Sequence, residues 1–268
     1  MIRRHVIDVD YDSTLGYPDQ FNITRFTIIL KVFLNPMRPD PGHHFGHIRN
    51  FGKVVTFQAW TDADWETYKK GFKSDVEKYL NSPKMNLFLL PRLVGSAKMS
   101  QIQMLYFKHR HPAQKYYQPC VQCGMSIELV KTKAGSHAAF DVMHVRDGDP
   151  DVRSFTRHKT GGRDTGILSI HDIDRWAPAP ADGVPQNAAS HEVGHVVGLD
   201  HSNNDDPQCT NNQSICYGKP FTPEYFDLMG NGNRVSAADA PPWLNRIPAH
   251  ARGLQWRATT LRPDWIDI

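Results

Sequence analysis

The sequence predicts an α+β protein in which helices pack against one twisted, mixed β-sheet. Runs of β-branched and apolar residues, bounded by Pro, Gly and Asn, recur between residues 5 and 173 and are typical of strands. One stretch between them has its apolar residues at helical spacing. The 268 residues contain no repeat and no long linker, and a chain of this length can bury one large core. We therefore expect a single domain over residues 1–268.

Strands are expected over residues 5–12, 25–36, 52–60, 86–90, 101–107, 125–132, 138–145 and 166–173. A helix is expected over residues 61–80, with Thr61 or Asp62 capping its first turn. Its apolar and aromatic residues recur at helical spacing: Trp65, Tyr68, Phe72, Val76, Tyr79 and Leu80. These side chains are predicted to be core rather than ligands of a bound group.

Charge and hydropathy exclude two classes of function. The formal net charge is +3, from 31 basic and 28 acidic residues, and the chain has no dense basic run, so nucleic acid is not an expected partner. No apolar run approaches the roughly 20 residues that cross a bilayer, so no transmembrane segment is expected. Residues 1–18 alternate Val and Ile with Asp and lack the apolar stretch of a signal peptide. If the protein leaves the cell, another route carries it or a signal has been removed.

Four cysteines form two local pairs, Cys120 with Cys123 and Cys209 with Cys216. An even count suits two disulfides in an oxidising compartment, and the second pair could close a loop. A structural zinc held by all four thiolates is the alternative, and it requires the two pairs to meet in space. A redox role for the first pair is less well supported, because no clear helix follows it.

The segment "HEVGHVVGLDH", residues 191–201, carries the main chemical signal. It lies in a predicted helix that begins after Pro185, has Asn187 or Ser190 near its cap, and ends near Gly198. Residues four apart share one helix face, so His191 and His195 can present their imidazoles to one point.

A turn at Gly198 would bring His201 round as a third nitrogen ligand. Three protein ligands leave one coordination position open, as in catalytic zinc sites. Glu192 lies beside the ligands and is suited to act as general base toward a zinc-activated water. We therefore expect metal-assisted hydrolysis of peptide bonds, with one catalytic Zn²⁺.

His191, Glu192, His195, Gly198 and His201 match every fixed position of HExxHxxGxxH, and the chain thereby resembles the metzincin zinc metallopeptidases. The family's second mark, a methionine in a tight turn, is matched by Met229 in "FDLMGNGN". The resemblance implies three histidine zinc ligands, Glu192 as base and Met229 as a structural support below the metal. It also implies a twisted mixed sheet with helix over about residues 1–185, and a long active-site helix, Met-turn and C-terminal helical subdomain over about 186–268.

The segment between the third histidine and the turn departs from the family pattern. Residues Ser202 to Leu228 form a longer connection than in matrixins, and this connection holds Cys209 and Cys216. By resemblance it helps to form the wall that accepts a substrate side chain. Some metzincins stabilise the tetrahedral intermediate with a tyrosine two residues after the turn methionine, and that position is Asn231 here. Tyr217 or Tyr225 could replace it, although packing is the more common role of such a residue.

Three further segments carry residues that could contribute to the site or pack near it. By resemblance an edge strand pairs with extended substrate, and residues 166–173 are the candidate; His171 within them is expected at the surface. Residues 146–152, "RDGDPDV", have aspartates that suit Ca²⁺ but lack the spacing of a full EF-hand loop, so an ordinary turn is expected. The C-terminal stretch is expected to hold a short helix interrupted by Pro241, Pro242 and Pro248, with His250 structural or exposed.

The sequence thus predicts a zinc endopeptidase acting on a protein or peptide substrate, secreted or delivered outside the producing cell. The chain is also loosely similar to metzincin-type toxin domains of bacterial secretion-system effectors, which implies a target-cell protein as substrate and an inhibitor or immunity protein as partner. A general extracellular peptidase and a catalytically silent, zinc-stabilised binding protein are the alternatives. The presence of Glu192 argues against the silent form, because losing the base is the simplest way to abolish activity.

Overall fold

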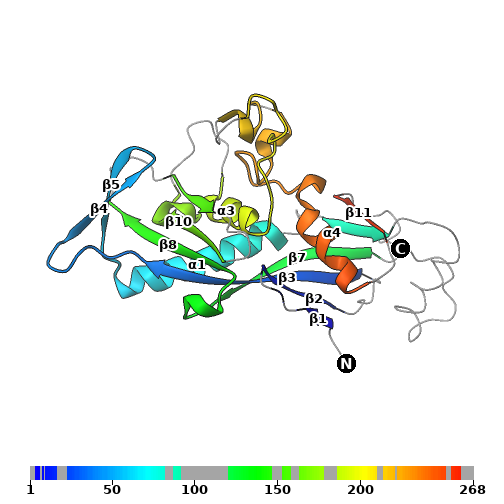
Figure 1. Cartoon of the computed structure of the whole chain (residues 1–268), viewed down its shortest axis with the longest axis horizontal. Coiled ribbons are helices and arrows are strands. Elements are labelled where there is room, and N and C mark those ends of the chain that lie inside the picture. Colours follow the sequence, from blue (N-terminus) through cyan, green and yellow to red (C-terminus); the bar gives the residue numbers. More distant parts are fainter. Residues whose placement is uncertain are drawn as a thin grey trace, which may run out of the picture.

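The computed structural model describes residues 4–6, 8, 10–16, 23–81, 87–91, 120–146, 153–157, 163–177, 186–209, 214–220, 222–251 and 255–260. These residues form a mixed β-sheet with helices against it (Figure 1), which confirms the predicted α+β class. The strands are β1 (Arg4–Val6), β2 (Asp12–Leu15), β3 (Ile23–Pro36), β4 (Phe45–Asn50), β5 (Lys53–Gln58), β6 (Phe88–Pro91), β7 (Cys120–Leu129), β8 (Ala138–Val145), β9 (Phe155–Arg157), β10 (Asp164–Ser169) and β11 (Trp256–Thr259). The α-helices are α1 (Asp62–Asn81), α3 (Ala188–Val196) and α4 (Pro241–Arg246).

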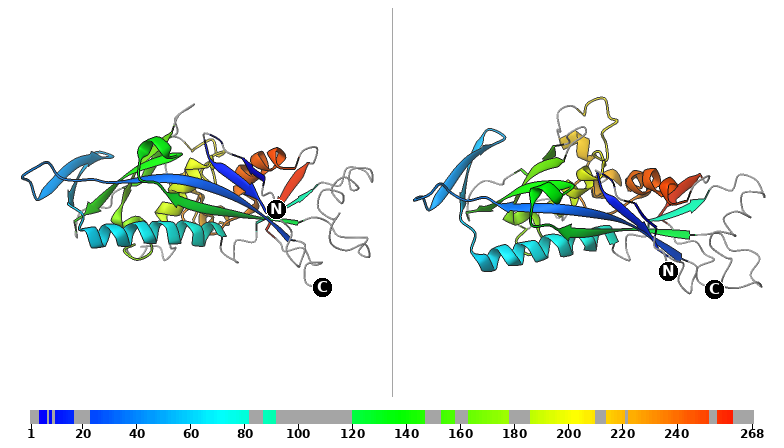
Figure 2. Two further views of the ribbon diagram at one scale, coloured as in Figure 1. Left: turned by 90° about the horizontal axis from the view of Figure 1, so that it is seen from below. Right: turned by 60° about the horizontal axis from the view of Figure 1, so that its bottom comes forward.

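The main sheet has the order β11-β6-β7-β3-β8-β10-β9. Its centre is parallel, because β3 pairs in parallel with β7 and β8, and β10 pairs in parallel with β8. Both ends are antiparallel: β9 pairs with β10 at one end, and β11 pairs with β6 at the other. The β4–β5 hairpin joins β8 through β5 and projects from one end of the molecule (Figures 1 and 2).

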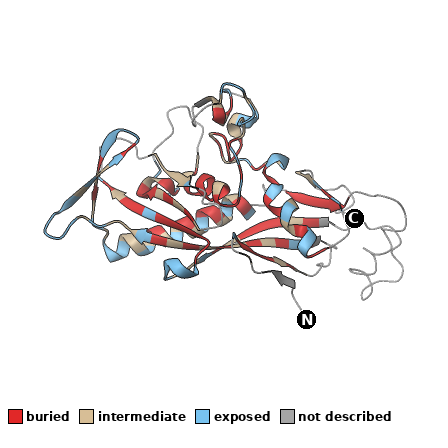
Figure 3. Cartoon of the chain, viewed as in Figure 1, coloured by how far each residue is buried: buried red, intermediate tan, exposed pale blue. Residues whose placement is uncertain are grey.

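The long strand β3 organises the core. Its buried positions alternate with less buried ones, and Phe26, Ile28, Leu30 and Val32 are fully buried. Such a period of two places one face of a strand in the core. Helix α1 runs along the sheet (Figure 2) and contacts both β7 and α3. Figure 3 shows this central region buried, whereas the outer surface of the β4–β5 hairpin is exposed.

Most predicted elements are confirmed with shifted ends. The predicted strands 25–36, 52–60, 86–90, 125–132 and 138–145 correspond to β3, β5, β6, β7 and β8, and the predicted helix 61–80 corresponds to α1. The predicted core residues of α1 are at least partly buried, and four of them are fully buried: Tyr68, Phe72, Val76 and Leu80. Strand β4 was not predicted, and the predicted strand 101–107 lies outside the described residues.

The predicted strand 5–12 is wrong, because this segment forms the start of an antiparallel hairpin. Strand β1 pairs with β2, with Val6 opposite Ser13. Between them the main-chain N–H of Asp8 donates to the carboxylate of Asp12 at 3.2 Å. The Asp8 carboxylate also accepts from Arg246 on α4. Aspartates that bond to nearby backbone favour turns over continuous strands.

Two other boundaries differ from the predictions. The predicted strand 166–173 ends at Ser169, because this serine and Asp172 form a reciprocal capping box that begins a 3₁₀ turn. Near the C-terminus, Pro241 and Pro242 begin α4 instead of interrupting it, since the first helical turn needs no N–H donor. Within the described residues the chain then returns to the sheet as β11. No helix of the described residues has the length and apolar character needed to cross a membrane.

Candidate metal centre

Helix α3 carries the histidine motif and is fixed at both ends. At its start the Asn187 side chain accepts from the N–H of Ser190 at 2.9 Å, which confirms Asn187 as the cap. At its end Gly198 has a φ of 91°, and the N–H of Leu199 bonds to the carbonyl of Gly194 at 3.0 Å. A left-handed glycine that ends a helix was predicted here and is confirmed.

The three histidines of the motif converge. One ring nitrogen from each of His191, His195 and His201 lies within 4.8 Å of the others, so these residues form a group that could hold a metal ion. The Nε2 atoms of His195 and His201 are 3.2 Å apart. Tetrahedral zinc with Zn–N bonds of about 2.05 Å separates its ligand nitrogens by about 3.3 Å. His191 and His201 are buried, and His195 is partly exposed.

Backbone carbonyls orient two of these rings. The Nδ1 of His191 lies 2.8 Å from the carbonyl oxygen of Leu228, and the Nδ1 of His195 lies 2.8 Å from that of Leu199. A carbonyl only accepts, so each Nδ1 carries the hydrogen and each neutral ring has its lone pair on Nε2. Convergent lone pairs repel one another unless a cation or a proton lies between them. Such Nδ1 bonding is also what orients histidine ligands in metal sites, so these residues fit a zinc ion.

Burial keeps the imidazoles in the form that binds metal. Together with neighbouring His195, it lowers the pKa of His191 to about 3 and the pKa of His201 to about 4. Because neutral imidazole is the metal-binding form, the ligands need not lose protons at neutral pH.

Glu192 lies beside the cluster without occupying it. Its side chain is 6% exposed, and burial raises its pKa to about 7, so it can accept and release a proton near neutral pH. Its Oε2 atom is buried and has no hydrogen-bond partner among the described residues. A buried carboxylate oxygen without a partner is costly, and such groups concentrate at functional sites.

Met229 packs against helix α3, which carries His191 and His195. It is 1% exposed, and a Cβ added to Gly194 would lie 2.4 Å from its sulfur. The helix can therefore approach the turn only because residue 194 is glycine. The N–H of Ser202 also bonds to the Met229 carbonyl at 3.0 Å, which ties the turn to the residue after His201.

Gly194→Ala is expected to lower the free energy of unfolding by about 1–3 kcal/mol, because the added methyl group overpacks the contact with Met229. Gly135→Ala is the matched control, since a Cβ there would meet its nearest atom at 3.9 Å. Urea unfolding followed by circular dichroism measures both variants. Equal stability of the two variants would contradict the packing role of Met229.

The edge strand differs from the prediction. Strand β10 is internal, because it pairs with β8 on one side and with β9 on the other, so β9 is the edge at this end of the main sheet. The Thr156 hydroxyl on β9 donates to the main-chain carbonyl of Glu192 at 3.1 Å, which places β9 against α3. His171 is partly exposed, and its Nδ1 lies 2.9 Å from the carbonyl oxygen of Trp176.

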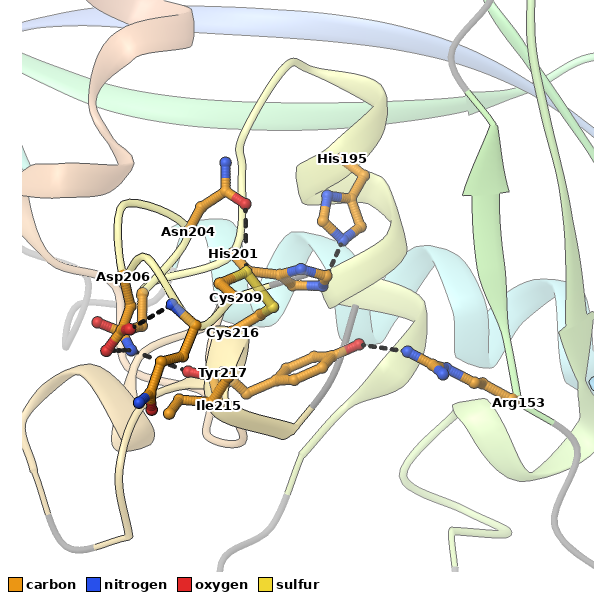
Figure 4. Close-up of a disulfide and its surroundings, with 11 residues drawn as sticks. Arg153, His195, His201, Asn204, Asp206, Cys209, Ile215, Cys216 and Tyr217 are labelled. Carbon is orange, nitrogen blue, oxygen red and sulfur yellow. Dashed lines mark hydrogen bonds between the residues drawn. A yellow bond between two sulfur atoms is a disulfide. The ribbon is translucent and has the colours of Figure 1, made fainter. Parts of the chain in front are cut away.

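The loop after His201 is closed by a disulfide between Cys209 and Cys216, one of the two predicted pairs (Figure 4). Tyr217 follows directly, and its ring centroid lies 4.2 Å from that of His201 and 5.6 Å from that of His191. The disulfide therefore anchors an aromatic ring on the histidine cluster. Tyr217, one of the two tyrosines that the sequence offered for the site, thus contacts the cluster.

Replacing both Cys209 and Cys216 with Ser is expected to lower the free energy of unfolding by about 2.5 kcal/mol, from the lost constraint on a loop of about eight residues. Urea unfolding of the wild type with and without reductant also measures how much the disulfide contributes to the free energy of unfolding. Reductant should leave the double variant unchanged, and a variant as stable as the oxidised wild type would contradict the prediction.

The first cysteine pair does not have disulfide geometry. Cys120 and Cys123 both lie in β7, in continuous register with β3. Three residues of strand separate their Cα atoms by about 10 Å, whereas a disulfide needs about 4.4–6.8 Å. The four-cysteine zinc alternative is also excluded, because the disulfide occupies the sulfur atoms of the other two cysteines.

Two residues outside the histidine motif, Arg153 and His250, have defined contacts in the fold. Arg153 was not predicted; its guanidinium lies 3.4 Å from the Tyr217 hydroxyl (Figure 4), and no periodic or motif signal marks it in the sequence. His250 is structural, because it is buried with its Nε2 2.8 Å from the hydroxyl of Ser13. Residues 146–152, whose aspartates suit Ca²⁺ but for which an ordinary turn is expected, lie outside the described residues except for Arg146.

The described geometry defines a buried three-histidine cluster that could bind a metal, with a glutamate beside it. Comparison of the chain with protein-family models, with curated proteins and with solved structures finds no match.

Proposed function

We propose that the protein is a zinc-dependent endopeptidase of metzincin type. His191, His195 and His201 would hold the zinc ion, Met229 supports the site from below, and Glu192 is the general base. The observation that carries the proposal is the Glu192 carboxylate, which is buried without a partner for Oε2 beside three convergent imidazoles. A purely structural site has no need for such a group.

The side chains divide the chemistry between them. When bound, the zinc ion supplies a Lewis acid that polarises a carbonyl group and acidifies water. Glu192 accepts a proton from the attacking water at its carboxylate and delivers it to the leaving amide nitrogen. Its raised pKa suits both transfers, because the group then gains and loses a proton at similar cost near neutral pH.

The proposal includes the place of action. The Cys209–Cys216 disulfide supports a protein that works in an oxidising compartment, outside the cytoplasm of its producer. We propose a polypeptide substrate in that compartment or in a target cell, and an inhibitor or immunity protein that restrains the enzyme. A general extracellular peptidase has the same site and differs only in its substrate range.

Zinc analysis together with cleavage of a mixed peptide library tests the proposal. The purified protein should hold one zinc ion, and it should cleave peptides internally until a chelator stops the reaction and added zinc restores it. Zinc without cleavage of any peptide or protein pool would support the silent, zinc-stabilised binding protein instead. Absence of bound zinc after reconstitution would overturn both.

A further inference from the structure

Arg153 is held rigidly at the edge of the histidine cluster, just before strand β9. Its main-chain N–H donates to the Asn50 side chain at 3.1 Å, and its carbonyl accepts from the same side chain at 3.1 Å. Asn50 is buried at the end of β4, so the turn of the β4–β5 hairpin clamps the backbone of this arginine. The guanidinium carbon lies 4.8 Å from the ring centroid of Phe51, which restrains the side chain as well.

Tyr217 approaches the same guanidinium from the other side, on the disulfide-closed loop. An N–H of Arg153 donates to the Tyr217 hydroxyl at 3.4 Å, and the Tyr217 ring lies over His201 (Figure 4). A phenol that accepts this bond still carries its own hydrogen for a different acceptor. Two kinds of donor, a guanidinium and a phenol, therefore lie together next to the proposed metal ligands.

The positive charge of Arg153 lies close to the buried cluster, because Tyr217 contacts both the guanidinium, at 3.4 Å, and the ring of His201, at 4.2 Å between ring centroids. His191 and His201 of that cluster, and Glu192 beside it, are buried. These groups are buried, so the field of Arg153 is only weakly screened there. A negative group of the substrate at this position would be attracted by the same field.

We propose that Arg153 and Tyr217 form a carboxylate-binding subsite, so that the enzyme prefers peptides with a carboxylate close to the cleaved bond. The inference rests on the proposed peptidase function and adds its substrate class. A planar guanidinium matches a carboxylate through two parallel N–H bonds, and the phenol can donate a third. The carboxylate belongs either to an Asp or Glu side chain or to the chain terminus of a peptide.

Matched peptides test the proposal. Starting from one cleaved peptide, the residues on each side of the bond are changed between Glu and Gln, and the C-terminus is made as the free acid or the amide. Arg153→Gln should lower kcat/KM about 10- to 100-fold for the preferred carboxylate peptide, since charged hydrogen bonds are lost, and should leave its neutral counterpart within about threefold. The matched pair, either Glu with Gln or free acid with amide, that the wild type distinguishes and Arg153→Gln cleaves at similar rates identifies the source of the carboxylate.

Two further variants sharpen the result. Arg157→Gln is the matched control, because this exposed arginine also lies over an aromatic ring, 5.0 Å from the centroid of Phe155, but has no contact with Tyr217 among the described interactions. It should retain the preference of the wild type. Arg153→Glu should reverse the preference toward peptides with Lys at the same position. Unchanged zinc content and Tm show that each variant is folded.

Several outcomes would overturn the inference. If Arg153→Gln lowers kcat equally for acidic and neutral peptides, Arg153 acts in the reaction itself and not in substrate selection. If the variant keeps the wild-type preference for carboxylate peptides, Arg153 does not bind the substrate carboxylate. If no peptide is cleaved, calorimetric binding of the Glu and Gln peptides to zinc-loaded Glu192→Gln protein still decides the point. Selective binding that depends on Arg153 would support the subsite while the peptidase function fails; equal binding would overturn the subsite.

Discussion

Glu192→Gln is expected to reduce peptide cleavage by about 10²- to 10⁴-fold, the usual contribution of a general base. Glutamine is nearly isosteric with glutamate but cannot accept the proton of the attacking water. The change also removes a buried charge, so the variant should fold at least as well as the wild type. Initial rates on one cleaved peptide, with zinc content measured on the same sample, give the comparison.

Glu66→Gln provides the control for Glu192→Gln. Glu66 lies on α1 with its side chain 60% exposed and paired with Lys69, so its replacement should change neither rate nor metal content. Zinc loss in Glu192→Gln would mean that the glutamate holds the site together instead of moving a proton. Full activity with zinc retained would remove Glu192 from the mechanism and leave the proposal without its base.

Removing the metal is expected to lower the Tm by roughly 10 °C. Free zinc at about a thousand times its Kd stabilises the folded state by about 4 kcal/mol, and a chain of this size loses about 2–4 °C for each kcal/mol. His195→Ala should remove this dependence, so that chelator no longer changes the Tm of the variant. Thermal unfolding with zinc and with chelator measures both effects.

A histidine outside the cluster supplies the control for the metal experiment. His47 is exposed on β4 and bonds to the side chain of Thr56 at 3.1 Å. His47→Ala should show the same chelator response as the wild type. A Tm that does not respond to zinc in the wild type would show that the three imidazoles hold no ion under these conditions.

The parts of this protein that were predictable depend on short-range patterns. Strand β3 alternates buried and less buried residues along its own length, and α1 repeats its aromatic and aliphatic residues every three or four positions. Helix α3 likewise carries His191 and His195 at i and i+4 and has its stop signal at Gly198. Each of these features depends on residues close together in the sequence, so the sequence pattern predicts it without knowledge of the fold.

The parts that escaped prediction depend on contacts between distant segments. Strand β4 contains Gly46 and Asn50, which are poor strand formers, and it is held by pairing with β5. Strand β9 is only three residues long. Arg153 reaches the site because a side chain about a hundred positions earlier clamps its backbone and a tyrosine 64 positions later meets its guanidinium. No local sequence pattern predicts such contacts between distant residues.

The cap of α3 fixes the histidine-bearing helix to the rest of the fold. The Asn187 amide donates to Asp174 at 2.9 Å, its backbone N–H donates to Asn233 at 2.7 Å, and α3 contacts α1. A nine-residue helix is too short to persist in water alone, so these contacts with the rest of the fold keep the histidines in place. Binding of zinc therefore does not require α3 to fold at the same time. We expect zinc to bind in a single bimolecular step, and we expect amide hydrogen exchange in α3 to be slow already in the metal-free chain. If the histidines bind zinc as proposed, the chain can fold first and take up the ion afterwards.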